Sequence, residues 1–277
     1  MIVYQGPSAI DGREIVVILT GLKARGSKNA KTGELIQSWI LRADVEPHIA
    51  VKTGDDASVC GQCPHRPLLA SMLARAGLPS SPCYVRTGEA PLSIHRAFRR
   101  GSYARAETMD QVREALAGRR LRIGSYGDPA AAPVDLWRML ASMAEGHVGY
   151  THQWQAVGFD AAAWAPLVMA SADTRAEARQ AESIGMRYFR VSNGVDRQDR
   201  EVTCPASAEG GRKAQCSDCM LCAGTTKRAR SIVIADHATG HARRVIAIKP
   251  APSYGMSFGE LREAFQLERA LMLADQA

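Results

Sequence analysis

Seven cysteines fall into two groups, and their spacing is the clearest chemical feature of the sequence. Cys60 and Cys63 form a CxxC pair, and Cys83 follows after residues 68–78, which have helical periodicity. The second group is Cys204, Cys216, Cys219 and Cys222. An odd number of cysteines in a reducing cytosol does not suit a disulfide framework, so the spacing predicts metal ligation or redox chemistry.

The first group suits either of two metal sites. A CxxC pair places two thiolates on one tight turn, as tetrahedral zinc or an iron–sulfur cluster requires. A cluster held by Cys60, Cys63 and Cys83 alone would leave one iron open for a cofactor. A closed zinc site with His65 as fourth ligand is the alternative.

The second group supplies four soft ligands from one short segment. A CxxCxxC run with a remote Cys-Pro is typical of a ferredoxin-like [4Fe–4S] cluster, but zinc knuckles use similar spacings. The remaining alternative is that these cysteines are buried core residues. We expect a four-cysteine metal module over residues 201–226, because the loop has few apolar residues with which to fold itself.

The helices and strands predicted outside the cysteine groups follow an α/β pattern. Residues 13–22 and 34–43 read as two strands of an N-terminal β-hairpin with a basic, glycine-rich tip at residues 23–33. From about Leu121 onward, short apolar strands alternate with helical segments, which indicates parallel βα units. One such helix is expected to open at Thr174 with Glu177 and to close at Gly185.

This alternation predicts a partial (β/α) TIM-type barrel. We expect residues 1–200 to form the barrel and its hairpin, and residues 227–277 to complete the domain. That last segment reads as strands at 231–237 and 244–249 and a helix at 257–277.

Polar residues gather where the expected strands end: Ser125, Tyr126 and Asp128; His152, Gln153 and Trp154; Ser171 and Asp173; and Ser192 and Asn193. In a β/α barrel this edge carries the active site. The alternative is that strand ends meet turns, which are polar in any case.

Charge and hydropathy favour an anionic partner and no membrane. The 277 residues carry a net charge of +7, and the longest apolar run, residues 161–172, is shorter than the roughly 20 residues that span a bilayer. Arg96, Arg99 and Arg100 share a helical face near Phe98 and Tyr103, and a second basic run lies at 227–230. Such runs serve phosphate binding or are solvated surface. We expect a cytoplasmic protein.

Several motifs together resemble a known family. The close cysteine pair followed by Pro64, the Cys83–Tyr84 dipeptide, the segments 122–129 and 149–154, and the CPAS and CxxCxxC motifs are similar to a group of phage-encoded radical SAM-like proteins. That group is mostly of unknown function and includes gene product 88-like relatives. The resemblance covers roughly residues 27–224. In radical SAM enzymes, three cysteines hold a [4Fe–4S] cluster whose open iron binds S-adenosylmethionine (SAM).

The resemblance implies an iron–sulfur enzyme that cleaves SAM to a 5′-deoxyadenosyl radical and modifies a substrate. The first cysteine group would hold the cluster, and the second a further [4Fe–4S] cluster or zinc. His152 and Asp128 are the expected catalytic residues, and Ser125, Ser171 and Asn193 would contact SAM or substrate.

The expected partners are an electron donor such as flavodoxin or ferredoxin and a nucleic acid or nucleotide substrate, such as a nucleobase of phage nucleic acid. The alternative function is a non-catalytic, zinc-stabilised nucleic-acid-binding protein.

Overall fold

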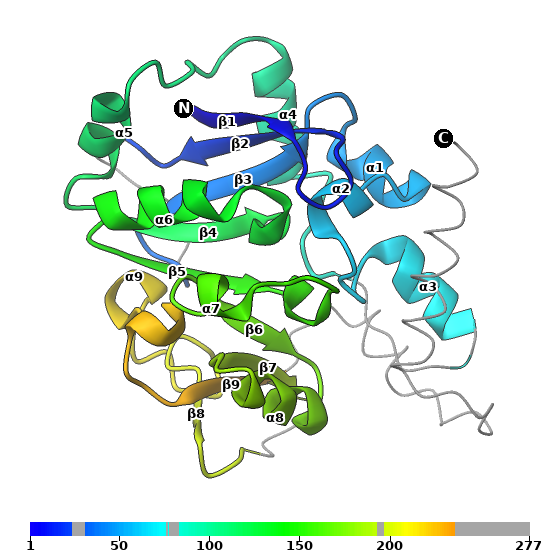
Figure 1. Ribbon diagram of the computed structural model, residues 1–277, viewed down its shortest axis with the longest axis vertical. Coiled ribbons are helices and arrows are strands. Elements are labelled where there is room, and N and C mark those ends of the chain that lie inside the picture. Colours follow the sequence, from blue (N-terminus) through cyan, green and yellow to red (C-terminus); the bar gives the residue numbers. More distant parts are fainter. Residues whose placement is uncertain (24–30, 76, 78–82, 193–196, 236–277) are drawn as a thin grey trace.

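The protein is built on one large, mostly parallel sheet. The computed structural model describes residues 1–23, 31–75, 77, 83–192 and 197–235. Within them, nine strands pair in the order β1-β2-β3-β4-β5-β6-β7-β9-β8 (Figure 1). The strands are β1 (Ile2–Pro7), β2 (Glu14–Thr20), β3 (Ile36–Arg42), β4 (Arg120–Tyr126), β5 (Gly146–Thr151), β6 (Met169–Ala172), β7 (Tyr188–Ser192), β8 (Glu201–Thr203) and β9 (Ser231–Ala235).

The strand directions confirm the expected α/β class. Strands β2 and β3 pair antiparallel, from Ile15↔Arg42 to Thr20↔Gln37, which confirms the N-terminal hairpin. Strand β1 adds to its outer edge, also antiparallel. Every later pairing, from β3–β4 to β8–β9, is parallel. Strands β1 and β8 lie at opposite edges of the described sheet, which does not close into a barrel.

The helices occupy the connections between the strands. They are α1 (Pro47–Thr53), α2 (Ala57–Cys60), α3 (Pro67–Arg75), α4 (Ala90–Arg99), α5 (Met109–Leu116), α6 (Val134–Met143), α7 (Ala161–Trp164), α8 (Arg175–Ser183) and α9 (Cys216–Cys219), with 3₁₀ turns η1 (Pro129–Ala131), η2 (Gln153–Gln155) and η3 (Gly224–Thr226). The expected start of α8 is confirmed, because Thr174 and Glu177 form a reciprocal capping box. Gly185 follows with a φ of 81°.

The two faces of the sheet have different covers. Alternate strand residues such as Leu121, Ile123, Ala170 and Ala172 pack with residues of α5, α6 and α8 in one core cluster. On the opposite face, Met169, Ile232 and Ile234 pack with Cys204, Leu221 and Cys222. Because side chains alternate along a strand, the second cysteine segment covers the face that these helices leave.

Several expected features lie outside the described residues. These are the central part of the hairpin tip, Asn193, the strand at 244–249 and the helix at 257–277. Strand β9 confirms the strand expected from residue 231. No helix in the described part of the chain combines the length and the apolar composition that a bilayer crossing requires.

Candidate metal centres and the sheet edge

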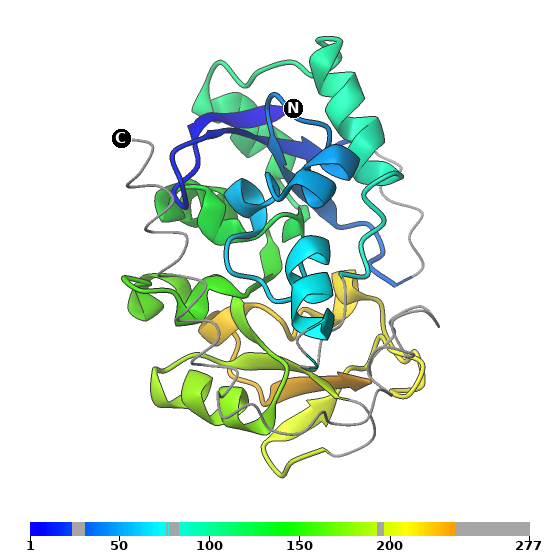
Figure 2. The same ribbon diagram turned by 90° about the vertical axis from the view of Figure 1, so that its right-hand side faces the viewer.

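The first cysteine group lies where β3 ends. Helices α1 and α2 follow β3 directly, and Cys60 is the last residue of α2. Figure 2 shows α1, α2 and α3 side by side beside the sheet. Because β3 to β6 are parallel, the segments that follow these strands meet at the same edge. The cysteine loop therefore adjoins the ends of β4, β5 and β6.

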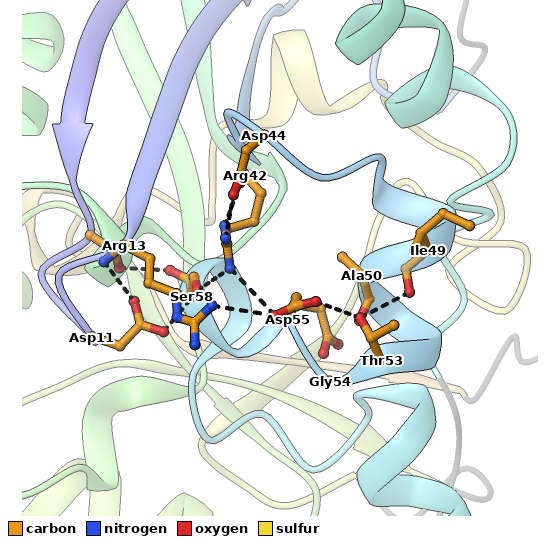
Figure 3. Close-up of polar contacts among 12 residues, drawn as sticks. Asp11, Arg13, Arg42, Asp44, Ile49, Ala50, Thr53, Gly54, Asp55 and Ser58 are labelled. Carbon is orange, nitrogen blue, oxygen red and sulfur yellow. Dashed lines mark hydrogen bonds and ion pairs between the residues drawn. The ribbon is translucent and has the colours of Figure 1, made fainter. Parts of the chain in front are cut away.

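A polar network anchors α2 to the end of β3 (Figure 3). The buried Arg42 side chain donates to Ser58 Oγ at 3.1 Å and to Asp44 Oδ2 at 2.8 Å. Ser58 Oγ in turn donates to Asp11 Oδ2 at 2.8 Å. Charge-assisted hydrogen bonds of this kind are stronger than neutral ones, so α2 and Cys60 are fixed in place.

The turn after Cys60 is clamped by a side chain from the end of β5. Gln153 Nε2 donates to the Cys60 carbonyl at 2.9 Å, and Gln153 Oε1 accepts from the Gln62 N–H at 3.0 Å. Between them, Gly61 has a φ of 53°, and a Cβ there would lie 2.2 Å from Gln153 Oε1. Arg66 also holds this turn, because its guanidinium donates to the Gly61 carbonyl at 3.1 Å. Glycine is therefore required at position 61.

Cys83 joins Cys60 and Cys63 although 19 residues separate it from Cys63. The Cys83 N–H donates to the His65 carbonyl at 2.7 Å. Removal from water, together with Asp56 and the other two thiols, raises the pKa of Cys60 well above its ordinary value. Removal from water and the neighbouring Cys83 do the same for Cys63. The thiols of Cys60, Cys63 and Cys83 thus act on one another's pKa values, and a bound cation would favour their thiolate forms.

The surroundings of Tyr126 indicate whether the first cysteine group fits a metal–sulfur centre. Its side chain is 5% exposed, and its hydroxyl has no hydrogen-bond partner within the described residues. Removal from water, then the neighbouring Cys60, Asp56 and Cys83, raise its pKa well above the ordinary value. An unsatisfied buried donor costs about 1–3 kcal/mol. A metal-bound thiolate or a cluster sulfide would supply the missing acceptor, so the residues present fit such a group.

Asp128, expected to be catalytic, links the ends of β4 and β5. Its carboxylate accepts from Thr151 Oγ1 and from the His152 N–H, both at 2.7 Å, and from the Ala130 N–H at 3.0 Å. Burial raises its pKa although these hydrogen bonds lower it. The Asp128 carboxylate thus holds the His152 backbone in place.

The residues expected to contact SAM or substrate differ in whether their polar groups already have hydrogen-bond partners. Ser125 Oγ donates to Gln37 Oε1 at 2.6 Å, so this hydroxyl is already engaged. The Ser171 carbonyl accepts from Trp154 Nε1 at 2.7 Å, and the residue is half-buried at the edge. Asn193 lies outside the described residues.

The structure brings His152 together with Asp173, another of the expected strand-end residues, and with His65, which the sequence placed with the first cysteine group. His65 Nε2 lies 3.0 Å from Asp173 Oδ1, and the His65 and His152 ring centroids are 5.2 Å apart. One ligand atom from each of the three side chains lies within 4.8 Å of the others. The sequence indicated this cluster only through the positions of its residues: His152 and Asp173 each follow a strand, and His65 follows the CxxC pair.

The second cysteine group assembles on the face of the sheet. The Cys204 N–H donates to the Val233 carbonyl and the Cys216 N–H to the Lys31 carbonyl, both at 2.9 Å. Burial, with added effects from Cys204, Cys216 and Cys219, raises the pKa of Cys222 to about 12, although a hydrogen bond with Tyr150 opposes the shift. Cys204, Cys216 and Cys219 therefore lie near enough to Cys222 to act on its pKa.

Arg122 lies between the two cysteine groups. It projects from β4 and donates to the Tyr84 hydroxyl at 3.4 Å, next to Cys83. Burial lowers the pKa of Arg122, but Tyr84, Tyr150 and Cys216 outweigh it and raise that pKa overall. The guanidinium therefore places positive charge beside the thiols of the second group.

Two of the three arginines expected to bind phosphate have internal partners. Arg96 donates to both carboxylate oxygens of Glu46, at 2.8 and 3.3 Å, and Arg99 donates to the Ala43 carbonyl at 3.1 Å. Arg100 and the second basic run, which includes Lys227 and Arg228, are exposed.

Comparisons with family models, with curated proteins and with solved structures find no match to this chain.

Proposed function

We propose that this chain is a radical SAM-type iron–sulfur enzyme in which Cys60, Cys63 and Cys83 hold a [4Fe–4S] cluster. The observation that carries the proposal is that Cys83, from a distant segment, is hydrogen-bonded through its N–H to the His65 carbonyl beside the CxxC pair, at the carboxyl edge of a parallel sheet. Strands β3 to β7 and β9 run parallel in the described sheet, and the CxxC pair follows the first of them. This arrangement is compatible with a partial (β/α) barrel.

The cluster, with SAM bound at its open iron, would supply reductive cleavage of SAM to a 5′-deoxyadenosyl radical. The residues of the chain would prepare the site for that chemistry. Tyr126 would donate its hydroxyl to a sulfur of the centre, and Gln153 would hold the cysteine turn. Asp128 would orient His152, and His152 and Ser171 would contact SAM or substrate from the same edge.

The second cysteine group would bind a further [4Fe–4S] cluster or zinc. Its four thiolates would close the coordination sphere, while Tyr150 and Arg122 would offset their charge. An electron donor such as flavodoxin or ferredoxin would supply the electron in a reducing, cytoplasmic setting.

The proposed substrate is a nucleobase or nucleotide, which the net charge of +7 and the exposed basic run favour. That run adjoins the second cysteine group.

The test is 5′-deoxyadenosine formation by anaerobically prepared protein with SAM and dithionite. Cys60→Ala, Cys63→Ala and Cys83→Ala should each abolish it, because each removes a ligand of the open cluster. Cys219→Ala, from the second group, should retain some cleavage in protein whose circular dichroism shows a folded chain. Continued cleavage by Cys60→Ala would show that the site is wrongly assigned.

A second candidate function is that of a zinc-stabilised nucleic-acid-binding protein without catalytic activity. The exposed Lys227 and Arg228 beside Cys222 favour it, because a zinc-folded loop would present them to phosphates. Colourless zinc protein that binds nucleic acid and leaves SAM intact would support this function.

A further inference from the structure

Three potential metal ligands from different segments meet beside the first cysteine group. His65 follows the CxxC pair, His152 follows β5 and Asp173 follows β6. Their ligand atoms all lie within 4.8 Å of one another, and each residue is half-buried. The side chains of His65 and Asp173 are 25% and 29% exposed, so an ion could reach them from solvent.

We propose that His65, His152 and Asp173 bind one divalent transition-metal ion in a site separate from both cysteine groups. Two ligands about 2.1 Å from an ion and at right angles to each other lie about 3.0 Å apart. His65 Nε2 and Asp173 Oδ1 are 3.0 Å apart. The pair therefore already has the spacing of adjacent ligands, and His152 supplies the third position.

The donor set defines the class of ion. Two imidazoles and one carboxylate suit Fe²⁺, Mn²⁺, Co²⁺ or Zn²⁺, whereas the cysteines favour softer centres. Three protein ligands leave positions open for water or for an oxygen atom of a substrate, as in catalytic metal sites. A phosphate or carboxylate oxygen is the ligand class expected there.

The backbone around each ligand is held in place. The His152 N–H donates to Asp128 at 2.7 Å, and the Asp173 N–H donates to Glu177 Oε2 at 2.7 Å. The His65 carbonyl accepts from the Cys83 N–H at 2.7 Å. Supporting contacts of this kind orient metal ligands before the ion arrives.

The site adjoins the first cysteine group without sharing its thiols. The His65 backbone N–H interacts with the Cys63 thiol, whereas the His65 ring nitrogen points to Asp173. An ion bound there would hold a substrate beside the first group. The proposal fits an iron–sulfur cluster at that group, and it excludes the closed zinc site in which His65 would be the fourth ligand.

The test is Co²⁺ binding to the intact protein, followed by visible and near-ultraviolet absorption. Co²⁺ held by nitrogen and oxygen gives weak visible bands, whereas thiolate ligation adds strong near-ultraviolet charge transfer. Wild-type protein should bind about one Co²⁺ per chain with the first signature. His152→Ala and the isosteric Asp173→Asn should each weaken that binding at least about tenfold. His48→Ala, outside the site, should bind like wild type.

No nitrogen- and oxygen-ligated Co²⁺ in wild-type protein would overturn the proposal, as would undiminished binding in both His152→Ala and Asp173→Asn. The first result would leave the three residues as a hydrogen-bonded cluster without a metal. Since the readout does not involve SAM, neither result bears on the function of the cysteine groups.

Discussion

At the scale of single residues, the first cysteine group depends on the space at Gly61. The backbone there has a φ of 53°, and Gln153 occupies the volume that a side chain would need. Gln153 also makes the two hydrogen bonds that hold the cysteine turn. Any side chain at position 61 would displace the residue that fixes Cys60.

We predict that Gly61→Ala lowers both stability and metal content at the first group. Gly118→Ala is the matched control, because Gly118 has a φ of 66° and no atom within 4 Å of an added Cβ. A side chain at a positive φ costs about 1–2 kcal/mol or more, so both variants should lose free energy of unfolding, and Gly61→Ala should lose the more because its ψ of −125° lies outside the left-handed helical region. Only Gly61→Ala should also lose metal, measured per folded chain. Equal metal content in the two variants would contradict the role given to Gln153.

Contacts between residues close in sequence could be predicted, but contacts between distant residues could not. The CxxC pair puts Cys60 and Cys63 on one turn by sequence alone. His65 and Asp173 are 108 residues apart, and only the order of the strands brings them into contact. Tyr126 was expected only as one of several polar residues at strand ends, because the burial of its hydroxyl beside the cysteines follows from tertiary packing.

At the scale of elements, a buried ion pair joins β7 to β8. Arg190 and Glu201 meet through two hydrogen bonds of 2.7 and 2.8 Å, and their side chains are 3% and 0% exposed. Burial would raise the pKa of Glu201, but hydrogen bonds from Arg190 and the Gln198 N–H lower it overall. Both strands pair with β9, so the ion pair spans two strands that do not pair with each other.

We predict that Glu201→Gln lowers the free energy of unfolding by about 3 kcal/mol, because it leaves the Arg190 charge buried without a counter-ion. In wild type, the unfolded chain takes up a proton at Glu201 near its ordinary pKa of 4.5, while the folded chain takes it up only at lower pH. Stability should therefore fall as the pH drops through that window, and the variant should show a smaller fall. Denaturant titration measures both effects.

The control is Asp135→Asn, which breaks an ion pair with Arg138 in which Asp135 is 83% exposed. Its effect on unfolding should be small, since water screens such pairs. A Glu201→Gln effect no larger than that of this control would contradict the assigned role.

Elements with strong local signals were predictable, whereas those defined by pairing were not. The capping box at Thr174 and Glu177 specified the start of α8 through adjacent atoms. Strand β8 has only three residues, and its position beyond β9 follows from tertiary pairing. Strand β1 also had no separate signal in the sequence, because its residues, Ile2–Pro7, do not follow a regular apolar pattern.

At the scale of the whole molecule, the two cysteine groups use different parts of one sheet. The first lies at the carboxyl edge, and the second covers the face that α5, α6 and α8 leave. Arg122 and Tyr150 project from that face between them. Positive charge on the surface is carried in part by Arg100, Lys227 and Arg228, which are exposed.

We predict that binding to single-stranded DNA or RNA weakens linearly in a log–log plot against salt concentration, because phosphate contacts release counterions. Neutralising Lys227 and Arg228 together should make the slope shallower by about 2. Arg96→Gln is the control and should leave the slope nearly unchanged, because Arg96 is paired with Glu46. A flat salt dependence, or no binding at low salt, would remove nucleic acid as the substrate.

Elemental analysis of anaerobically purified protein shows whether the first cysteine group binds an iron–sulfur cluster. Wild-type protein should be brown and contain iron and acid-labile sulfide. A variant with Cys60, Cys63 and Cys83 all changed to Ala should lose about four of each per chain, as removal of one [4Fe–4S] cluster requires. Colourless wild-type protein that contains zinc and no sulfide would contradict the account.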